Sequence, residues 1–482
     1  MANKVDSPPE SVARVDERGL KINTRFIGAI VAVATIGGFM FGYDSGVING
    51  TQQGLERTFN LSKLGTGLNV GAILLGCAFG AFLAGRLADW FGRRNVMVVA
   101  ALLFIVSAIG AGAADSSTVF IIARFVGGLG VGAASVLAPA YISEVTPAHI
   151  RGRLSSVQQI MIITGLTGAF LVNYLLAQWA GGSTSTLWGG LPAWRWMFWM
   201  QTIPATIFFV CLLFIPESPR FLVFKKREAK ALVVLTRLFG AEVGQRKVEE
   251  IRMSVSAHTD RPKLSDLVDK ARGRIRPIVW VGIGLAVFQQ LVGINVVFYY
   301  GAVLWQSVGF SENDSLKINI LSGALSILAC MFTIAVIDKI GRKPLLLVGS
   351  AGMTITLGLM AAAFSSATMV NGQVHLSDQA GLLALISANA YVVLFNLSWG
   401  PVMWVMLGEM FPNQIRGSGL AVAGFAQWIA NYGISVSFPA LAATLGLAIT
   451  YGFYAASALI SFFFVAAAVH ETKGRELEDM VG

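Results

Sequence analysis

Long apolar stretches with almost no charged residues recur along nearly the whole chain. Each is about 20 residues long or longer, which is the length that a helix needs to cross the hydrocarbon core of a bilayer. The pattern predicts an all-α membrane protein with twelve transmembrane helices, at residues 27–48, 66–85, 96–114, 118–140, 156–177, 197–215, 277–305, 319–337, 345–364, 381–407, 418–438 and 445–468.

A charged stretch at residues 217–276 separates six of these spans from the other six. It contains two runs of helical character, at 225–239 and 246–256, so we expect a small intracellular helical domain there. Its role stays open between a part in gating and a solvated linker. The expected segments are a leader at 1–26, a six-helix half at 27–216, the insert at 217–276, a second half at 277–468 and a tail at 469–482.

The composition agrees with a membrane protein. Hydrophobic residues make up 55% of the 482 residues and charged residues 13%, which leaves too little polar surface to cover a soluble globule. The net charge of +10 follows the predicted topology, because of the 36 Lys and Arg residues only Arg57, Lys63, Arg195 and Lys317 fall in loops on the side opposite the termini. The positive-inside rule then places both termini in the cytoplasm, and no nucleic-acid partner is expected. The short first external loop, at 49–65, favours a bacterial inner membrane.

The two halves repeat two charged motifs at the ends of corresponding spans. D-x-x-G-R-[RK] begins at Asp89 and Asp338, and E-x-x-P-x-x-I-R-G begins at Glu144 and Glu409. Two halves of parallel topology around a central site are the usual plan of an alternating-access carrier. We expect the charged residues of these motifs to gate the cytoplasmic face, although they could instead be only orientation signals and helix caps. They are Asp89, Arg93, Glu144, Arg151, Asp338, Arg342, Glu409 and Arg416.

Further motifs occur in order at particular spans: Gly42-Tyr43-Asp44 in the first, Pro216-Glu217-Ser218-Pro219-Arg220 after the sixth, Gln289-Gln290-Leu291-Val292-Gly293-Ile294-Asn295 in the seventh, Gly400-Pro401 with Trp404 in the tenth, and Glu471-Thr472-Lys473-Gly474 at the end. With these motifs the chain resembles the sugar porter family of the major facilitator superfamily, from about residue 27 to 478. Within that family it is most similar to the bacterial proton-coupled xylose and glucose symporters.

This resemblance implies the major facilitator fold, with two pseudo-symmetric six-helix halves, and transport of a neutral monosaccharide without a cofactor or enzymatic step. The sugar is a hexose such as glucose or a pentose such as xylose. Leu166 and Ser326 stand where the xylose symporters have a glutamine and an asparagine, so the resemblance does not assign xylose. His470 replaces the proline that family members usually carry before the terminal motif.

Two charged residues lie inside the predicted spans. Asp44 is the only carboxylate there away from the span ends, and Arg124 is the only buried cation. At about 1.5 Å of rise per residue, both lie at a similar depth below the outer ends of their spans and could meet. The pair could be a static ion pair that helps packing or a proton switch. The resemblance implies proton symport, because proton-coupled sugar porters carry this aspartate, and facilitative uniport is the alternative.

The other buried polar residues are mostly amides, which both donate and accept hydrogen bonds and so match the hydroxyls of a sugar. The candidate sugar-binding residues are Gln159, Gln289, Gln290, Asn295, Trp404 and Gln427. Buried amides can also simply join helices, and that reading stays open. Tyr299 and Tyr300 follow Gly293, so the outer part of the seventh span could bend over the sugar as a lid.

The sequence offers little support for other classes of protein. A membrane enzyme would need a nucleophile, a metal cluster or paired acids at membrane depth, and none is evident. Cys77, Cys211 and Cys330 fall in apolar runs and suggest neither disulfides nor a metal site. A sugar sensor on a transporter scaffold would be expected to have a long cytoplasmic tail, and it remains a second alternative. The expected partners are a monosaccharide, a proton and the lipid bilayer, with no obligatory protein partner.

Overall fold

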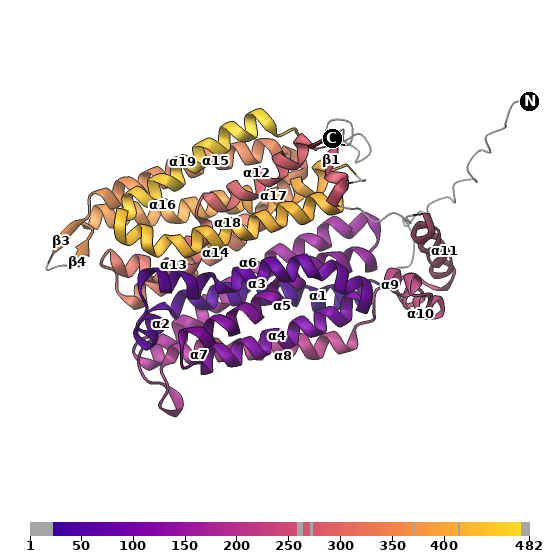
Figure 1. Ribbon diagram of the computed structural model, residues 1–482, viewed down its shortest axis with the longest axis horizontal. Coiled ribbons are helices and arrows are strands. Elements are labelled where there is room, and N and C mark those ends of the chain that lie inside the picture. Colours follow the sequence, from indigo (N-terminus) through magenta and orange to yellow (C-terminus); the bar gives the residue numbers. More distant parts are fainter. Residues whose placement is uncertain (1–22, 258–263, 270–272, 371–372, 413–414, 474–482) are drawn as a thin grey trace, which may run out of the picture.

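The apolar stretches form long helices that pack into two bundles lying side by side (Figure 1). The computed structural model describes residues 23–257, 264–269, 273–370, 373–412 and 415–473. The first half consists of α1 (Thr24–Val47), α3 (Lys63–Phe91), α4 (Arg93–Ala113), α5 (Ser117–Val145), α6 (Ala148–Ala180), α7 (Ala193–Met200) and α8 (Thr202–Phe214). The second consists of α12 (Pro277–Leu291), α13 (Ile294–Ser307), α14 (Glu312–Ile340), α15 (Arg342–Ser365), α16 (Asp378–Leu397), α17 (Trp399–Met410), α18 (Arg416–Leu445) and α19 (Leu447–Ala468).

Eleven of the described helical segments are long and apolar enough to cross a membrane. The predicted span at 418–438 is not among them, although α18 covers it with 30 residues. Gln427 and Asn431 lower the hydropathy of α18, and both side chains are buried against other helices. With α18, every predicted span corresponds to a long helix or a pair of helices.

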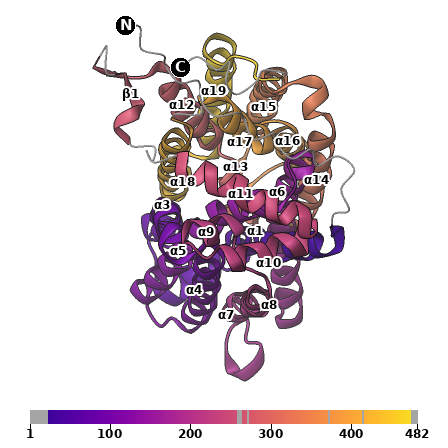
Figure 2. The same cartoon turned by 90° about the vertical axis from the view of Figure 1, so that its right-hand side faces the viewer.

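The insert lies at one end of the bundle, and we call this the insert end. It contains α9 (Pro219–Phe224), α10 (Glu228–Phe239), α11 (Ala241–Ala257), the short helix η3 (Leu264–Leu267) and an antiparallel pair, β1 (Val268–Asp269) and β2 (Arg274–Ile275). Figure 2 shows α9, α10 and α11 across this end. Lys226 has a φ of 57°, which breaks the helix predicted at 225–239 before α10 begins. The Asn23 N–H donates to the Leu238 carbonyl at 3.1 Å, so α10 is joined to the start of α1.

The opposite end carries the short connections, and we call it the hairpin end (Figure 1). There α1 continues into η1 (Ile48–Gly50) and α2 (Gln52–Phe59), and a second short helix, η2 (Trp188–Gly190), precedes α7. The hairpin of β3 (Thr368–Val370) and β4 (Gln373–His375) joins α15 to α16.

Two of the predicted spans are broken helices. The span at 277–305 divides into α12 and α13 at Gly293, whose φ of 79° suits a residue without a Cβ. The span at 381–407 divides into α16 and α17 at Ser398. Because Pro401 has no N–H, it cannot continue the helical bond to the carbonyl four residues earlier. Broken helices of this kind occur in membranes where the backbone is buried in protein.

Glycines let the helices of each half approach closely. A Cβ at Gly42 on α1 would lie 1.7 Å from the Ile162 carbonyl oxygen on α6. A Cβ at Gly76 on α3 would lie 2.2 Å from the Phe125 carbonyl oxygen on α5. Small residues at such crossings are typical of packed membrane helices, and they account for many of the 53 glycines in the chain.

Candidate transport site

The two intramembrane charges meet in the interior of the first half. Asp44 lies near the end of α1 and Arg124 near the start of α5. Arg124 Nη1 bonds to Asp44 Oδ1, and Nη2 donates to the Asp44 backbone carbonyl at 3.1 Å. The side chains are 0% and 1% exposed, so the pair is separated from solvent. The Phe198 ring covers the guanidinium, with 5.5 Å between the guanidinium carbon and the ring centroid.

The second carboxylate oxygen of Asp44 is buried but unpaired in the described structure. Oδ2 has no hydrogen-bond partner among the described residues. A Cβ at Gly127 would lie 3.4 Å from this oxygen and 2.3 Å from the Ser107 hydroxyl, so a glycine there leaves room for both groups. A carboxylate with one oxygen on a guanidinium and one unpaired can take up a proton without rearranging the backbone. Within the described residues, no group of three or more His, Cys, Asp or Glu could hold a metal ion.

Four of the candidate sugar-binding amides form one hydrogen-bonded network in the second half. Gln289 on α12 donates to the Trp399 carbonyl at 3.0 Å and accepts from Gln427 Nε2 at 2.6 Å. Its Oε1 also accepts from Gln290 at 3.2 Å. Asn295 on α13 donates to Gln290 Oε1 at 2.6 Å. Gln289 is therefore the centre of a neutral polar cluster shared by α12, α13, α17 and α18.

The other two candidates have no described hydrogen bond to this network. Gln159 is half-buried on α6, in the first half, and Trp404 on α17 is 39% exposed. Sequence reasoning chose Gln159 but passed over its neighbour Gln158, which is 6% exposed and has no described hydrogen-bond partner for either amide atom. Trp399, five residues before Trp404, is fully buried and donates to Ser350 through Nε1 at 2.9 Å.

Described hydrogen bonds between the two halves gather at the hairpin end. Asn49, in η1, donates to the Phe298 carbonyl at 2.7 Å and accepts from the Ala302 N–H at 3.3 Å and from Asn319 Nδ2 at 2.8 Å. Gln52 donates to a further carbonyl on α13 at 2.5 Å. The segment predicted as an external loop, 49–65, contains η1 and α2, and its Asn49 and Gln52 side chains are each 1% exposed. These side chains fix α13 against the first half.

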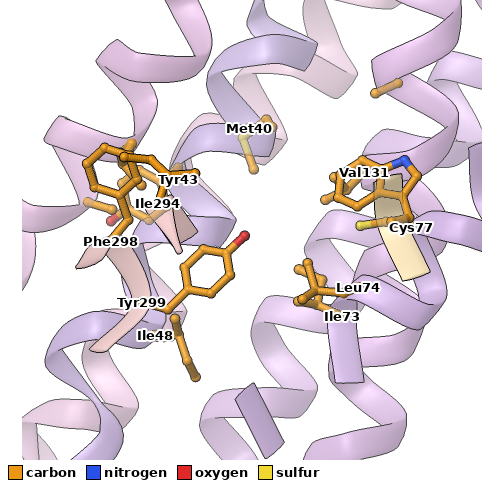
Figure 3. Close-up of a cluster of buried hydrophobic side chains, with 14 of the residues drawn as sticks. Met40, Tyr43, Ile48, Ile73, Leu74, Cys77, Val131, Ile294, Phe298 and Tyr299 are labelled. Carbon is orange, nitrogen blue, oxygen red and sulfur yellow. The ribbon is translucent and has the colours of Figure 1, made fainter. Parts of the chain in front are cut away.

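The two candidate lid tyrosines have different surroundings. Tyr300 donates its hydroxyl to the Ser435 carbonyl at 2.6 Å and so joins α13 to α18 within the second half. Tyr299 projects from α13 toward the first half, with its hydroxyl in the space between Met40 and Leu74 (Figure 3). It belongs to a buried apolar cluster that joins residues of α1, α3 and α13. Tyr299 is thus at the seam between the halves.

The repeated charged motifs form ion pairs at the insert end, each within one half. In the first half Arg93 lies 3.3 Å from Asp89 and 3.2 Å from Glu144, and Glu144 also accepts from the Ser218 hydroxyl at 2.5 Å. The pairs join α3 and α4 to α5.

The second half repeats this arrangement. Arg342 lies 2.9 Å from Asp338 and 2.7 Å from Glu409, which accepts from the Thr472 hydroxyl at 2.6 Å. Arg416 differs from the expectation, since it donates to the Phe411 carbonyl at 3.2 Å, a backbone bond. The side chain of Arg151 lies outside the described part of the structure.

Two carboxylates that sequence reasoning did not select complete these networks. Glu217 accepts from the Arg94 N–H at 3.1 Å, at the start of α4. Glu471 accepts from the N–H groups of Arg342 at 3.0 Å and Lys343 at 2.9 Å, at the start of α15. A carboxylate at a helix N-terminus satisfies free N–H groups and the helix dipole. The sequence contains a signal for both carboxylates, because Glu217-Ser218 and Glu471-Thr472 repeat an E-[ST] pair after the sixth and twelfth spans.

The pKa values of the two carboxyl groups shift in opposite directions. Burial raises the pKa of Glu217 above its ordinary value, and the backbone N–H groups around it offset this only in part. Burial also raises the pKa of Glu471, but the N–H groups of Lys473, Arg342, Lys343 and Thr472 outweigh it and hold the pKa below its ordinary value. Of the two carboxylates at the helix N-termini, Glu471 is therefore the more firmly ionised.

Comparison with known proteins agrees with this architecture. The model of the family described as "Sugar (and other) transporter" matches residues 30–481. The glucose transport protein of Synechocystis sp. is 51% identical, over 99% of this chain and all of the relative. The D-xylose-proton symporter of Escherichia coli is 36% identical, over 95% of this chain and 96% of the relative.

Solved structures give the same result. The inward-open structure of the xylose transporter XylE from E. coli has a TM-score of 0.79 and 35% identity, and the match covers 94% of this chain and 99% of that one. XylE is also known bound to 6-bromo-6-deoxy-D-glucose, and that structure has a TM-score of 0.77 over 95% of this chain and 99% of that one, at 36% identity. The predicted fold and family are confirmed. The chain is a multi-pass membrane transporter with the major facilitator fold, and it belongs to the sugar (and other) transporter family.

Proposed function

We propose that this protein is a proton-coupled symporter of a neutral monosaccharide, which it moves across the plasma membrane by alternating access. The observation that carries the proposal is that the protein contains two different polar sites. The first half has the buried ion pair of Asp44 and Arg124, and the second half has the neutral amide network around Gln289. The named relatives support both parts, since one is a glucose transport protein and another is a xylose-proton symporter. The higher identity to the former favours glucose.

The proton acts on the first half. When Asp44 is ionised, its charge and that of Arg124 compensate each other inside the bundle. Protonation of Asp44 removes the attraction between the two opposite charges, and of the described bonds only that from Arg124 to the Asp44 backbone carbonyl still joins α1 to α5 at this point. Asn49 follows five residues later on the same chain segment, about 7.5 Å further along the helix, and holds α13. A shift of α1 therefore changes the contacts that close the hairpin end.

The sugar acts on the second half. Gln289, Gln290, Asn295 and Gln427 supply amide donors and acceptors without a net charge, and Oε1 of Gln427 has no described partner. A monosaccharide hydroxyl can replace bonds within the network because it both donates and accepts. Trp404 offers an aromatic face for the C–H side of the sugar ring. A charged solute would leave its charge unpaired beside these groups.

The described state fits the inward-facing part of the cycle. The positive-inside rule predicts a cytoplasmic location for the insert end, because the charged insert lies there. The bonds of Asn49 and Gln52 then close the external end. We assign the insert-end networks of Arg93 and Arg342 to keeping each half rigid while the halves rock. A bacterial inner membrane is the location that the relatives favour.

The proposal is tested by uptake of labelled glucose and xylose into proteoliposomes, with and without an inward proton gradient. We expect the gradient to drive accumulation of glucose by the wild type. Asp44→Asn should lose accumulation but keep exchange of sugar, whereas Asp115→Asn, at a carboxylate that is 97% exposed, should behave as the wild type.

Two other results would contradict the proposal. Equal rates of equilibration with and without the gradient would identify a facilitative uniporter and leave the Asp44–Arg124 pair a packing role. The absence of any sugar uptake, with sugar binding intact, would identify a sensor.

A further inference from the structure

The break between α12 and α13 leaves the Val292 carbonyl without its helical partner. The Val296 N–H bonds to the Gly293 carbonyl at 3.1 Å and not to the Val292 carbonyl, which it would reach in an unbroken helix. A buried carbonyl in the membrane interior must find another donor. The Val292 carbonyl, which has lost its helical donor, therefore marks the point about which α13 can turn.

Tyrosines from two other helices surround this point. Tyr391 on α16 donates its hydroxyl to the Val292 carbonyl at 2.7 Å, and its side chain is 0% exposed. Tyr454 on α19 lies against Gly293, where an added Cβ would be 2.6 Å from a ring carbon. The first tyrosine supplies the missing hydrogen bond, and the second fills the space that the glycine leaves. Both positions of the break are thus held by side chains distant in sequence.

The two broken helices also brace each other. Tyr391 belongs to α16, which ends at the second break, and it binds the first break at Val292. Gln289 belongs to α12, which ends at the first break, and it binds the start of α17 through the Trp399 carbonyl. Gln289 is also the centre of the amide network. A rearrangement of that network on binding a ligand is therefore passed to both breaks.

We propose that Tyr391 is a positioning residue of the transport cycle: its hydroxyl holds the hinge carbonyl of Val292 and stabilises the position of α13 in which the hairpin end is closed. The proposal rests on the proposed function, because it takes α13 as the lid over the sugar site. Tyr391 touches the hinge and acts on the sugar only through it.

The consequence for transport follows from a shift between the closed and open positions of α13. Tyr391→Phe keeps the ring and removes one buried hydrogen bond, so the ratio of closed to open protein falls by about tenfold. A larger fraction of open, binding-competent protein lowers the KM for external sugar, because apparent affinity scales with that fraction. Slower closure lowers the turnover number. We expect both constants to fall by roughly three- to tenfold.

Tyr451→Phe provides a matched control. Tyr451 is 0% exposed and its ring centroid lies 5.7 Å from that of Tyr454, in the same aromatic cluster. Its hydroxyl has no hydrogen-bond partner among the described residues. The same chemical change at this position should therefore leave both transport constants unchanged.

The test measures KM and turnover for external sugar in intact cells, per amount of protein in the membrane. In parallel, deuterium uptake is followed in peptides that cover residues 294–307 of purified wild type and both variants. We expect Tyr391→Phe to lower KM and turnover together and to speed exchange in α13, with Tyr451→Phe like the wild type. Lower turnover at unchanged KM, no change at all, or the same changes in Tyr451→Phe would each overturn the proposal.

The deuterium-exchange measurement distinguishes a failure of the hinge role of Tyr391 from a failure of the proposed transport function. If the wild type transports no sugar, the proposed function fails, and faster exchange in α13 of Tyr391→Phe alone would still support the hinge contact. If the wild type transports sugar and exchange in α13 is the same in all three proteins, the hinge role fails and the proposed function stands.

Discussion

The two halves of this transporter share a helix arrangement but differ in the chemistry of their interiors. The first half contains an ion pair, Asp44 with Arg124, at 0% and 1% exposure. At the described positions of the second half, the polar interior is built around amides, with Gln289 at the centre. One fold therefore provides a place where a charge can be neutralised and a place where neutral hydroxyls can bind. We interpret the difference as a division of work between proton and sugar.

At the insert end, in contrast, both halves have the same set of interacting side chains. Each has an arginine, a glutamate on the neighbouring helix and a hydroxyl on that glutamate. The match is incomplete, because Arg342 reaches Glu409 through two nitrogens at 2.7 and 2.9 Å, whereas Arg93 reaches Glu144 through Nε at 3.2 Å. The network of the second half is the better satisfied of the two.

The largest expected effect concerns the ion pair. Arg124→Met leaves Asp44 as an unpaired buried charge, and we expect a loss of about 3 to 5 kcal/mol of stability, seen as a lower melting temperature in detergent. The double variant with Asp44→Asn should recover most of that loss because no charge remains. It should still lack proton-driven accumulation. A double variant as unstable as Arg124→Met would show that Arg124 acts through packing.

The second prediction concerns the amide network. Gln289→Ala removes the centre of the network, and we expect the KM for sugar to rise roughly 10- to 100-fold, as for the loss of one or two hydrogen bonds. Proton coupling at saturating sugar should persist, since Asp44 is untouched. Gln178→Ala, at an exposed amide on α6, serves as the control and should leave KM unchanged. Loss of coupling in Gln289→Ala would argue against separate sites.

The third prediction compares the two arginines at the insert end. Lysine cannot reproduce the planar fork of a guanidinium, so Arg342→Lys should cost roughly 1 to 2 kcal/mol and Arg93→Lys about half as much. Melting temperatures of the two purified variants give the comparison. Equal losses would mean that the closer geometry of Arg342 and Glu409 does not add to stability.

The smallest expected effect is that Glu217 and Glu471 contribute to stability with opposite dependence on pH. The pKa of Glu217 is raised above the ordinary 4.5, so its contribution to stability is present below that value and is lost as pH rises through the folded-state pKa. The pKa of Glu471 is lowered, so its contribution is present above 4.5 and is lost as pH falls through the folded-state pKa.

Glutamine variants reveal this difference. At neutral pH, Glu217→Gln should melt at or slightly above the wild-type temperature and Glu471→Gln a few degrees below it. The deficit of Glu471→Gln should shrink at pH values below 4.5. The same pH dependence in both variants would contradict the assigned directions.

The sequence predicts much of this fold because the relevant signals are local. Hydropathy locates the helices, and the repeated motifs locate the ion pairs at the insert end, since Arg93 and Asp89 lie only four residues apart. The depth of Asp44 and Arg124 could be estimated by counting residues from the span ends. A family resemblance added the candidate sugar-binding amides.

The remainder depends on contacts between distant segments. Asn49 bonds to Phe298, 249 residues away, and no local pattern distinguishes it from a loop residue. Tyr391 and Val292 are 99 residues apart, and their bond exists only because α16 packs beside the break between α12 and α13. Gln158 and Gln159 differ in burial only through the direction in which α6 faces its neighbours.

The central claim is that the proton and the sugar use separate halves, and the most direct test is the proton movement that sugar causes. Sugar is added to lightly buffered cells that express the protein, and the external pH is recorded. We predict alkalinisation with the wild type, none with Asp44→Asn at any sugar concentration, and recovery at high sugar concentration with Gln289→Ala. Alkalinisation by Asp44→Asn, or its loss at saturating sugar in Gln289→Ala, would contradict the account.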